Sequence, residues 1–179
     1  MQDIRPIFLI GMPGCGKTTL GRALARMTDR RFIDLDIYIE GRYSRSVSDI
    51  FAQMGEDKFR QIERAMLHEV AEMEDVVVAC GGGTPCYFDN MEYIDSRGTT
   101  ILLRASRARL IERLWRARSR RPAVARLSRG ELEQYVDRTL LTRSPWYDRA
   151  RLCLDASELE SKDSIATTAW RCINMLQQL

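Results

Sequence analysis

The segment "GMPGCGKTT", residues 11–19, follows the four apolar residues Ile7–Ile10 and leads into a stretch with helical spacing. It fits the phosphate-loop pattern G-x-x-x-x-G-K-[ST], with Lys17 and Thr18 at its end, and it lies between a predicted strand and a predicted helix, where that pattern belongs. In such a loop, backbone N–H groups at a helix N-terminus surround the phosphates, the lysine reaches the terminal phosphates, and the hydroxyl can bind Mg²⁺. The alternative is a glycine-rich turn that binds no ligand.

Four further strand-like runs follow the first one, and segments with helical spacing separate them. Regular alternation of strands and helices predicts a parallel sheet with helices on both faces. We therefore expect an α/β protein with three layers, α/β/α, around a five-stranded parallel sheet of the P-loop NTPase kind. The five runs are PIFLIG (6–11), RRFIDL (30–35), DVVVACGG (75–82), TTILLR (99–104) and RLCLDA (151–156).

Apolar residues that recur every three or four positions predict the helices. Helices are expected at Lys17–Met27, at about 56–73, at 107–116, within 128–143 and from about Lys162. The residues expected to face the core are Leu20, Leu24 and Met27 in the first helix; Phe59, Ile62, Met66, Val70 and Met73 in the second; Leu110, Ile111 and Leu114 in the third; and Ile165, Ala169, Cys172, Ile173 and Leu176 in the last.

Length and composition are those of one folded domain. A chain of 179 residues can bury a full core but is short for two ordinary domains, so residues 1–179 are expected to form one. No stretch approaches the roughly 20 apolar residues of a membrane span, and the first apolar run is too short for a signal peptide. Five cysteines without a C-x-x-C pair suit reduced thiols. We expect a cytoplasmic protein with no membrane partner.

The basic residues are mostly arginine, 25 against 3 lysines, and seven of the arginines lie between Arg113 and Arg129. Guanidinium groups bind phosphate and carboxylate in a bidentate manner, so this cluster indicates anionic ligands. Residues 118–131, RSRRPAVARLSRGE, contain a proline, a glycine and little apolar surface, which predicts an exposed, mobile loop. A basic patch also suits a nucleic-acid-binding protein, but the net charge of only +3 argues against one.

Two aspartates, Asp34 and Asp36, end the run RRFIDLD at residues 30–36. In an extended segment, alternate side chains point to the same face, so these carboxylates would lie close together, and two like charges that close need a reason. The alternative is structural, with Asp36 as the N-cap of a following helix and Asp34 solvated.

Three consecutive glycines, Gly81, Gly82 and Gly83, follow the apolar run 76–78. In an open α/β sheet, the carboxyl ends of the strands line the ligand crevice, so residues without side chains at this point allow a ligand to approach the backbone closely. The alternative is a loose turn.

Arg60 and Glu63 are one helical turn apart, so Glu63 can orient Arg60, although the spacing also fits an ordinary surface pair. His68 is the only histidine and falls in the middle of a predicted helix, away from the glycine loops, where a core or surface role is expected. A base that acts on an alcohol would then be a carboxylate.

In combination, these segments resemble the shikimate kinases. The resemblance covers nearly the whole chain, in order and with matching spacing, and its specificity lies in the combination, because each piece except the P-loop is weak alone. The matching pieces are the P-loop at 11–18, the acids at 34 and 36, FRxxE at Phe59–Glu63, GGG at 81–83, RP at Arg121–Pro122 and RxxxY at Arg143–Tyr147.

The resemblance implies a fold like that of the nucleoside monophosphate kinases, with a mobile, arginine-rich lid at about 113–130 and a substrate-binding region at about 34–62. It implies that the protein transfers the γ-phosphoryl group of ATP to the 3-hydroxyl of shikimate with Mg²⁺, a step of chorismate and aromatic amino-acid biosynthesis. ATP and shikimate would be its ligands, nucleic acid would not, and a monomer is expected.

The same resemblance implies a role for each matching residue. Asp36 would bind the acceptor hydroxyls and take the proton, and Lys17 and Arg121 would complete the catalytic set. Arg121, in the lid, would stabilise the transferred phosphoryl group. The ATP-binding residues would be Gly11, Gly14, Cys15, Gly16, Lys17, Thr18, Thr19 and Arg121; the substrate-binding residues Asp36, Arg60, Gly81, Gly82, Gly83 and Arg143, with Glu63 orienting Arg60; and the metal-binding residues Thr18 and Asp34.

The chain departs from the family pattern in two places. Ala123 and Val124 stand after the RP pair, where the family usually has two leucines, so weaker apolar contacts of the lid are expected. The arginine that covers the adenine is one of Arg113, Arg116 and Arg118, and the segment LDASELE at 154–160 is not a clear match to the family's adenine contact.

Two alternatives stay open on the sequence. Another small-molecule P-loop kinase, of the gluconate or nucleoside monophosphate type, would share the P-loop and the lid but not the full set of motifs. A nucleic-acid-binding NTPase module belongs to a different class and is suggested only by the arginine cluster.

Overall fold

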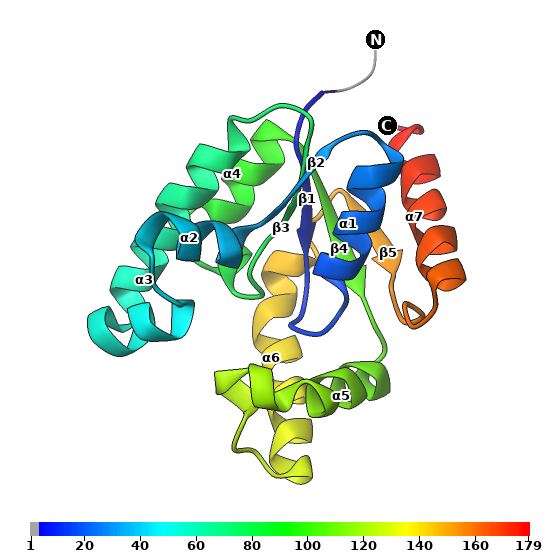
Figure 1. Cartoon of the computed structure of the whole chain (residues 1–179). Helices are drawn as coiled ribbons and strands as arrows, with labels where there is room; N and C mark the ends of the chain where they lie inside the picture. The colour runs from blue at the N-terminus through cyan, green and yellow to red at the C-terminus, as the bar shows by residue number, and fades with distance from the viewer. Residues whose placement is uncertain (1–3) are drawn as a thin grey trace.

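The computed structural model describes residues 4–179, in which five strands form one sheet with helices on both of its faces (Figure 1). The order across the sheet is β2-β3-β1-β4-β5, and every neighbouring pair is parallel. The predicted α/β class, the five strands and their parallel pairing are thus confirmed. The strands are β1 (Ile7–Ile10), β2 (Arg31–Asp34), β3 (Val76–Ala79), β4 (Thr99–Arg104) and β5 (Leu152–Asp155).

The helices α1 and α7 lie on one side of the sheet, and α3 and α4 lie on the other (Figure 1). Serine side chains at positions 46, 106, 128 and 161 accept a backbone hydrogen bond at the starts of α3, α5, α6 and α7, which satisfies donors that the first turn leaves free. The helices are α1 (Lys17–Met27), α2 (Leu35–Tyr43), α3 (Val47–Ala71), α4 (Asn90–Arg97), α5 (Arg107–Arg116), α6 (Arg129–Tyr147) and α7 (Lys162–Leu176), with short 3₁₀ turns η1 (Thr84–Cys86), η2 (Arg118–Arg120) and η3 (Pro122–Val124).

Strands β1 and β3 are buried along their whole length because helices cover both faces of the sheet, which explains their unbroken apolar sequences. The predicted inner faces of α1, α5 and α7 pack into this core. All five cysteines carry free thiols, as expected. Within residues 4–179, no helix combines the length and the apolar character that crossing a membrane requires.

The second predicted helix is longer than expected. Helix α3 begins at Val47 and changes direction at Gly55, whose φ of 78° and ψ of 171° are not helical. Leu67 is fully buried on its inner face, whereas Met66 is only partly buried. Met66 still packs against the core, as predicted, but Leu67, which fits the same three-to-four-residue spacing, was missed.

The two structural arguments about the aspartates were both wrong. Strand β2 ends at Asp34, and α2 begins at Leu35, so Asp36 lies in the first turn of a helix and not in an extended segment. Asp36 is not the N-cap either. Asp34 occupies that position, and its side chain makes no capping hydrogen bond. The two acids are thus free to serve another purpose.

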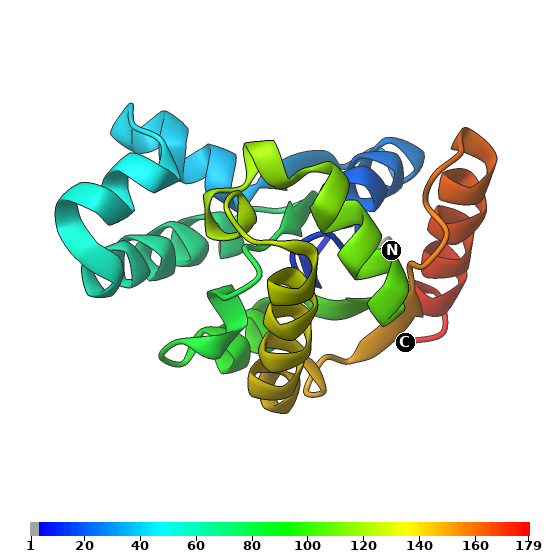
Figure 2. The same ribbon diagram turned by 90° about the horizontal axis from the view of Figure 1, so that it is seen from below.

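All strands point the same way, so the P-loop, Asp34 and the glycines after β3 meet at one edge of the sheet. Helix α5 and the segment after it lie in front of this edge, as the view onto it shows (Figure 2). The predicted exposed loop is open at Arg121 and Ala123, but Val124 is 3% exposed and anchors the segment to the core. Val124 therefore makes an apolar contact with the core, although the two leucines of the family pattern are absent.

Gly21 of α1 allows this helix to pack closely against β2. A Cβ at this position would lie 2.5 Å from Cε2 of Phe32 and 3.1 Å from Cδ1 of Leu9. We expect Gly21→Ala to lower the free energy of unfolding by about 1–3 kcal/mol, although alanine favours helix, because an overpacked core must shift. Urea unfolding followed by circular dichroism measures this change.

Gly41 of α2 supplies the matched control, because a Cβ there would meet no atom within 4 Å. Gly41→Ala should raise the free energy of unfolding by about 0.5–1 kcal/mol through helix propensity alone. A stabilising effect at both positions would contradict the close packing of α1 on β2.

Candidate active site

A cavity of about 430 Å³ opens at the carboxyl edge of the sheet, between the P-loop and α5. It brings together ten of the predicted site residues: Gly14, Gly16, Lys17, Thr18, Thr19, Asp34, Asp36, Gly81, Gly82 and Arg121. A second cavity of about 300 Å³ shares Pro13, Asp36 and Arg121 with the first and continues under the segment that holds Val124. The other predicted residues do not line either cavity; they are Gly11, Cys15, Arg60, Glu63, Gly83 and Arg143.

The P-loop has a backbone that only glycine fits. Gly11 and Gly16 have φ values of +135° and +107°, and a Cβ on Gly16 would lie 2.3 Å from Cδ1 of Leu159. The ammonium of Lys17 donates hydrogen bonds to the carbonyl oxygens of Gly11 at 2.8 Å and Met12 at 3.0 Å. These hydrogen bonds hold the loop in its curved conformation, with Lys17 on the cavity wall.

Cys15 lies inside this loop and is fully buried. Its Sγ accepts a hydrogen bond from the Lys17 ammonium at 3.7 Å. The thiol fills space between the loop and its lysine, which favours the packing role over a redox role.

Thr18 and Asp34 meet on the cavity wall. The hydroxyl of Thr18 donates a hydrogen bond to Oδ2 of Asp34 at 2.9 Å, which joins the start of α1 to the end of β2. Two oxygen donors, one neutral and one anionic, therefore stand side by side at the cavity. In the part of the chain from residue 4 onward, no cluster of three or more histidine, cysteine or acidic side chains is placed to hold a metal.

Asp36 faces both cavities and is the most perturbed acid of the site. The residue is exposed where it lines the two cavities, but the cavity walls surround its carboxyl group. This desolvation, with the negative charges of Glu63 and Asp34, raises the pKa of Asp36 from 3.8 to about 6, and Lys17 partly offsets the rise. A carboxyl group with a pKa in this range can exchange a proton near neutral pH.

Glu63 is a buried carboxylate with 1% exposure, so its two oxygens need partners. Oε2 accepts a hydrogen bond from Nη1 of Arg60 at 2.8 Å, and Oε1 accepts one from the hydroxyl of Thr84 at 2.5 Å. Burial alone would lower the pKa of Arg60, but the contacts with Glu63, Tyr87 and Glu56 together outweigh burial and raise it above its ordinary value. The predicted orienting pair is thus present and buried, and it is not a surface pair.

The Arg60 guanidinium is also enclosed by aromatic rings and a second acid. Its Cζ lies 4.0 Å from the ring centroid of Tyr87, and Nη2 lies 3.1 Å from Oε1 of Glu56. The hydroxyl of Tyr87 donates to the same oxygen of Glu56 at 2.7 Å. These contacts hold Arg60 in one orientation at the edge of the glycine triplet.

The backbone of the three glycines lies so close to Asp36, Arg143 and Arg60 that a side chain on any of the glycines would meet one of them. A Cβ on Gly81 would lie 3.2 Å from Oδ1 of Asp36, one on Gly82 would lie 2.9 Å from Nη1 of Arg143, and one on Gly83 would lie 2.9 Å from Nη2 of Arg60. The loose-turn alternative does not explain this spacing. Any group placed against this backbone meets a carboxylate and two guanidinium groups.

Arg143 has an unused donor. Within the described residues, its buried Nη1 has no hydrogen-bond partner. Four residues later, the Tyr147 hydroxyl donates to the carbonyl oxygen of Gly82 at 2.5 Å, which ties α6 to the triplet. Because unsatisfied buried donors are rare, Nη1 of Arg143 is suited to an anion that binds beside Gly82.

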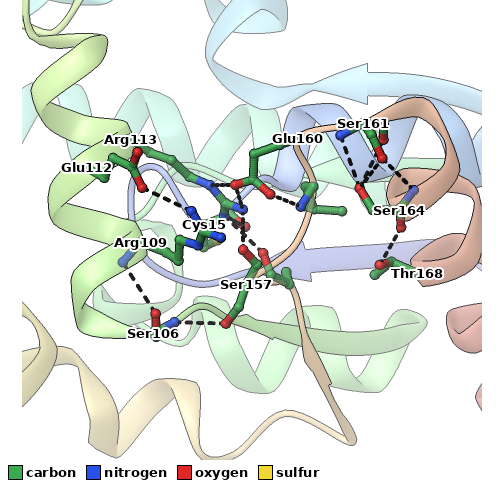
Figure 3. A network of polar contacts seen from close by, with 12 residues as sticks. Cys15, Ser106, Arg109, Glu112, Arg113, Ser157, Glu160, Ser161, Ser164 and Thr168 are labelled. Carbon is green, nitrogen blue, oxygen red and sulfur yellow. Dashed lines mark hydrogen bonds and ion pairs between the residues drawn. The ribbon is translucent and has the colours of Figure 1, made fainter.

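The structure separates the three arginines that were candidates for a base contact. Arg113 lines the larger cavity with Leu159. Arg116 pairs with Glu112 on the outer side of α5, and Arg118 stacks on Trp115 at 4.0 Å. Figure 3 shows Arg113 between the P-loop residue Cys15 and the segment with Ser157 and Glu160. His68 stacks on Tyr93 at 3.6 Å and lines neither cavity, as expected.

Sequence reasoning missed three residues of the site. Thr84 binds Glu63, Leu159 closes one end of the cavity, and Pro13 lines both cavities. Thr84 and Pro13 adjoin motifs that were recognised, so proximity to a motif was an available signal. Leu159 gave none, because a single leucine in an irregular segment cannot be told from a core residue.

Comparisons with known proteins agree with this geometry. The family model for shikimate kinase matches residues 13–174. A shikimate kinase of Phocaeicola vulgatus is 51% identical over 159 residues, which are 89% of this chain and 91% of that one. The crystal structure of a shikimate kinase from Bacteroides thetaiotaomicron has a TM-score of 0.95 and 42% identity, with 97% of this chain and 99% of that chain covered.

A shikimate kinase from Acinetobacter baumannii, solved in complex with shikimate, has a TM-score of 0.86 and 28% identity, with 98% of this chain and 94% of that chain covered. The family model spans far more than half of the chain, and the identity to the Phocaeicola vulgatus protein extends over nearly its full length. The chain therefore belongs to the shikimate kinase family.

Proposed function

We propose that this chain transfers the γ-phosphoryl group of ATP to the 3-hydroxyl of shikimate. The observation that carries the choice of acceptor is the free Nη1 of Arg143 beside Gly82, with Arg60 beside Gly83 and Asp36 beside Gly81. Shikimate is a carboxylate that bears ring hydroxyls, so it matches two guanidinium groups and one carboxylate. The relative from Acinetobacter baumannii was solved with this compound.

The larger cavity suits ATP with its phosphates at the P-loop and its base beside Arg113. Phosphates fit the P-loop and Lys17, because a loop of backbone N–H groups at a helix N-terminus favours anions. Arg113 and Leu159 line the same cavity and offer a guanidinium and an apolar side chain, which suit a flat base. We therefore place the base at Arg113 and not at Arg116 or Arg118.

The pair of Thr18 and Asp34 fits Mg²⁺. This ion prefers hard oxygen ligands, and it commonly uses one or two protein oxygens together with water and phosphate oxygens. A hydroxyl and a carboxylate 2.9 Å apart on the cavity wall meet that need. When bound, the ion would neutralise charge on the phosphate oxygens.

The residues of the site then have separate roles in binding the acceptor and in transferring the phosphoryl group. Arg60 and Arg143 hold the carboxylate of the acceptor, and Glu63 keeps Arg60 in place. Asp36 binds the acceptor hydroxyl and, with its raised pKa, takes its proton late in the transfer. Arg121 lines both cavities, so its guanidinium can contact the phosphoryl group on the donor and again on the acceptor.

Residues 113–130 are proposed to act as a lid. Arg121 lies on this segment, so closure would bring its charge to the transferred group and exclude water, the competing acceptor. The anchor at Val124 would limit the motion to the exposed part of the segment. Every proposed site residue comes from one chain, which is consistent with a working monomer.

The structure of the site also argues against the two alternative functions. A gluconate or nucleoside monophosphate kinase shares the P-loop and the lid, but the buried pair of Arg60 and Glu63 beside three glycines is part of the shikimate kinase pattern. A nucleic-acid-binding module is disfavoured by the net charge of only +3, and two arginines of the cluster, Arg113 and Arg116, are paired with glutamates.

The direct test is release of ADP by the purified protein with ATP, Mg²⁺ and shikimate. We expect turnover only when all three are present, because the bound acceptor completes the site. Gluconate, AMP and water alone replace shikimate in the control reactions. Turnover with gluconate or AMP that equals turnover with shikimate would refute the assignment.

Arg143→Ala is expected to raise the KM for shikimate by about 10- to 100-fold and to change the KM for ATP little, because a charge-assisted contact to one ligand is lost. Arg143→Lys should restore little, since an ammonium cannot reproduce the two-pronged contact. Steady-state kinetics with each substrate varied in turn measure the two constants.

Arg138 provides the control on the same helix, because it is exposed and lines neither cavity. Arg138→Ala should leave both KM values unchanged. Loss of ATP affinity alone in Arg143→Ala would place Arg143 at the nucleotide.

Asp36→Asn and Asp34→Asn should fail in different ways. Asp36→Asn keeps the shape but removes the proton acceptor, so we expect kcat to fall by about 10²-fold with an unchanged Mg²⁺ requirement. Asp34→Asn should shift the Mg²⁺ dependence to higher concentration and change shikimate binding less. Titrations of Mg²⁺ and of shikimate separate the two effects, and full activity in both variants would return the acids to a structural role.

Asp36→Asn should also stabilise the unliganded protein at pH 8. The pKa of Asp36 in the folded protein, about 6, lies above its ordinary value of 3.8, so its ionised form opposes folding above pH 6, while below pH 3.8 the group is neutral in both states. Because cavity water screens part of the effect, we expect a gain of about 1 kcal/mol, or roughly 2–4 °C in Tm, at pH 8 and none at pH 3.5. Thermal melts at the two pH values show whether the ionised carboxylate of Asp36 destabilises the folded protein.

A further inference from the structure

Glu160 connects the two residues that close the base end of the cavity. It lies between β5 and α7, directly before the capping residue Ser161. Its Oε1 accepts hydrogen bonds from Nη2 of Arg113 at 2.8 Å and from Nε at 3.3 Å, and its Oε2 accepts one from the backbone N–H of Leu159 at 2.9 Å (Figure 3). One carboxylate therefore joins α5 to the segment that carries Leu159.

All the donors of Arg113 are used within the protein. Besides the two bonds to Glu160, Nη1 donates to the carbonyl oxygens of Cys15 at 3.3 Å and Ala156 at 3.0 Å, and Nη2 donates to that of Ser157 at 2.8 Å. A guanidinium has five N–H groups, and these five hydrogen bonds use them all. Arg113 has no N–H left for a phosphate or a base edge, so it offers a ligand only its flat face.

Leu159 supplies the second surface. Its Cδ1 would be 2.3 Å from a Cβ on Gly16, so it packs directly against the P-loop backbone and cannot move toward it. Arg113 is 18% exposed and, like Leu159, lines the cavity. The distance between the flat guanidinium and the leucine thus depends on what holds the two residues together.

We propose that Glu160 is a positioning residue for nucleotide binding, which sets the arrangement of Arg113 and Leu159 around the base. This rests on the proposed ATP site but not on the identity of the acceptor. Hydrogen bonding to Arg113 holds the pKa of Glu160 below its ordinary value, so the carboxylate is ionised over the working pH range. Because a guanidinium face and a leucine stack on any base, the contact favours binding of a nucleoside part without reading its edge.

The test compares a ligand that has a base with one that lacks it. Calorimetric titration of Glu160→Gln should show a Kd for ADP raised about fivefold, because the ion pair with Arg113 becomes a weaker contact between a charge and a neutral amide, while the Kd for pyrophosphate stays within about twofold. In steady-state kinetics, the KM for ATP should rise by a similar factor, with the KM for shikimate and kcat unchanged. Glu160→Asp keeps the charge and should show a smaller loss.

Glu112 is the matched control. It is one residue from Arg113 on α5 and pairs with two exposed arginines, Arg109 at 3.1 Å and Arg116, but it lines neither cavity. Glu112→Gln should leave the affinity for ADP and for pyrophosphate unchanged.

Two outcomes would overturn the proposal. Equal weakening of ADP and pyrophosphate would mean that Glu160 acts on the P-loop, through the contact of Arg113 with Cys15, and not on the base. A lower Tm with unchanged ADP affinity would mean that Glu160 only fastens the segment before α7. The calorimetric and thermal measurements need no shikimate, so failure to phosphorylate shikimate would refute the acceptor assignment and leave this result intact.

Discussion

The geometry of the site depends on one backbone constraint, the absence of side chains at Gly11 and Gly16. Both residues have positive φ, and a Cβ at either one would overlap a neighbour, the carbonyl oxygen of Leu103 or the side chain of Leu159. The chain can therefore leave β1, wrap the phosphate cradle and start α1 within a few residues. Lys17, Thr18 and the wall formed by Leu159 take their places from this turn, and the rest of the cavity is arranged around it.

A buried carboxylate plays the corresponding part on the acceptor side. Glu63 is removed from water and is tolerated because Arg60 and Thr84 satisfy its two oxygens. Its charge has a second effect, since it helps to raise the pKa of Asp36 across the glycine triplet. One residue thus fixes the orientation of an arginine and adjusts the proton affinity of an acid. Such a site is less stable than one built for folding alone, because like charges are kept close together for chemistry.

Two arginines of the site are used differently. Arg143 keeps a buried N–H without a partner among the described residues, which suits a charged ligand that must be held in one orientation. Every N–H of Arg113 donates a hydrogen bond within the protein, so its guanidinium presents only a flat surface, which suits a ligand held by stacking. The same side chain therefore serves as a directional donor or as a platform, and its protein partners make the difference.

The sequence by itself determined the α/β class, the five strands, the phosphate loop and the family, because these follow from local periodicity and from motifs with fixed spacing. It also indicated the pairing of Arg60 with Glu63, since one helical turn separates them. Only the tertiary structure decided that this pair is buried, that Asp36 lies in a helix and not in a strand, and that Arg113 is the one of the three candidates for the base contact that lines the cavity. It alone brought Thr84 to Glu63 and Glu160 to Arg113, which are 21 and 47 positions apart. Contacts across such separations depend on how the helices pack on the sheet, and no local pattern encodes them.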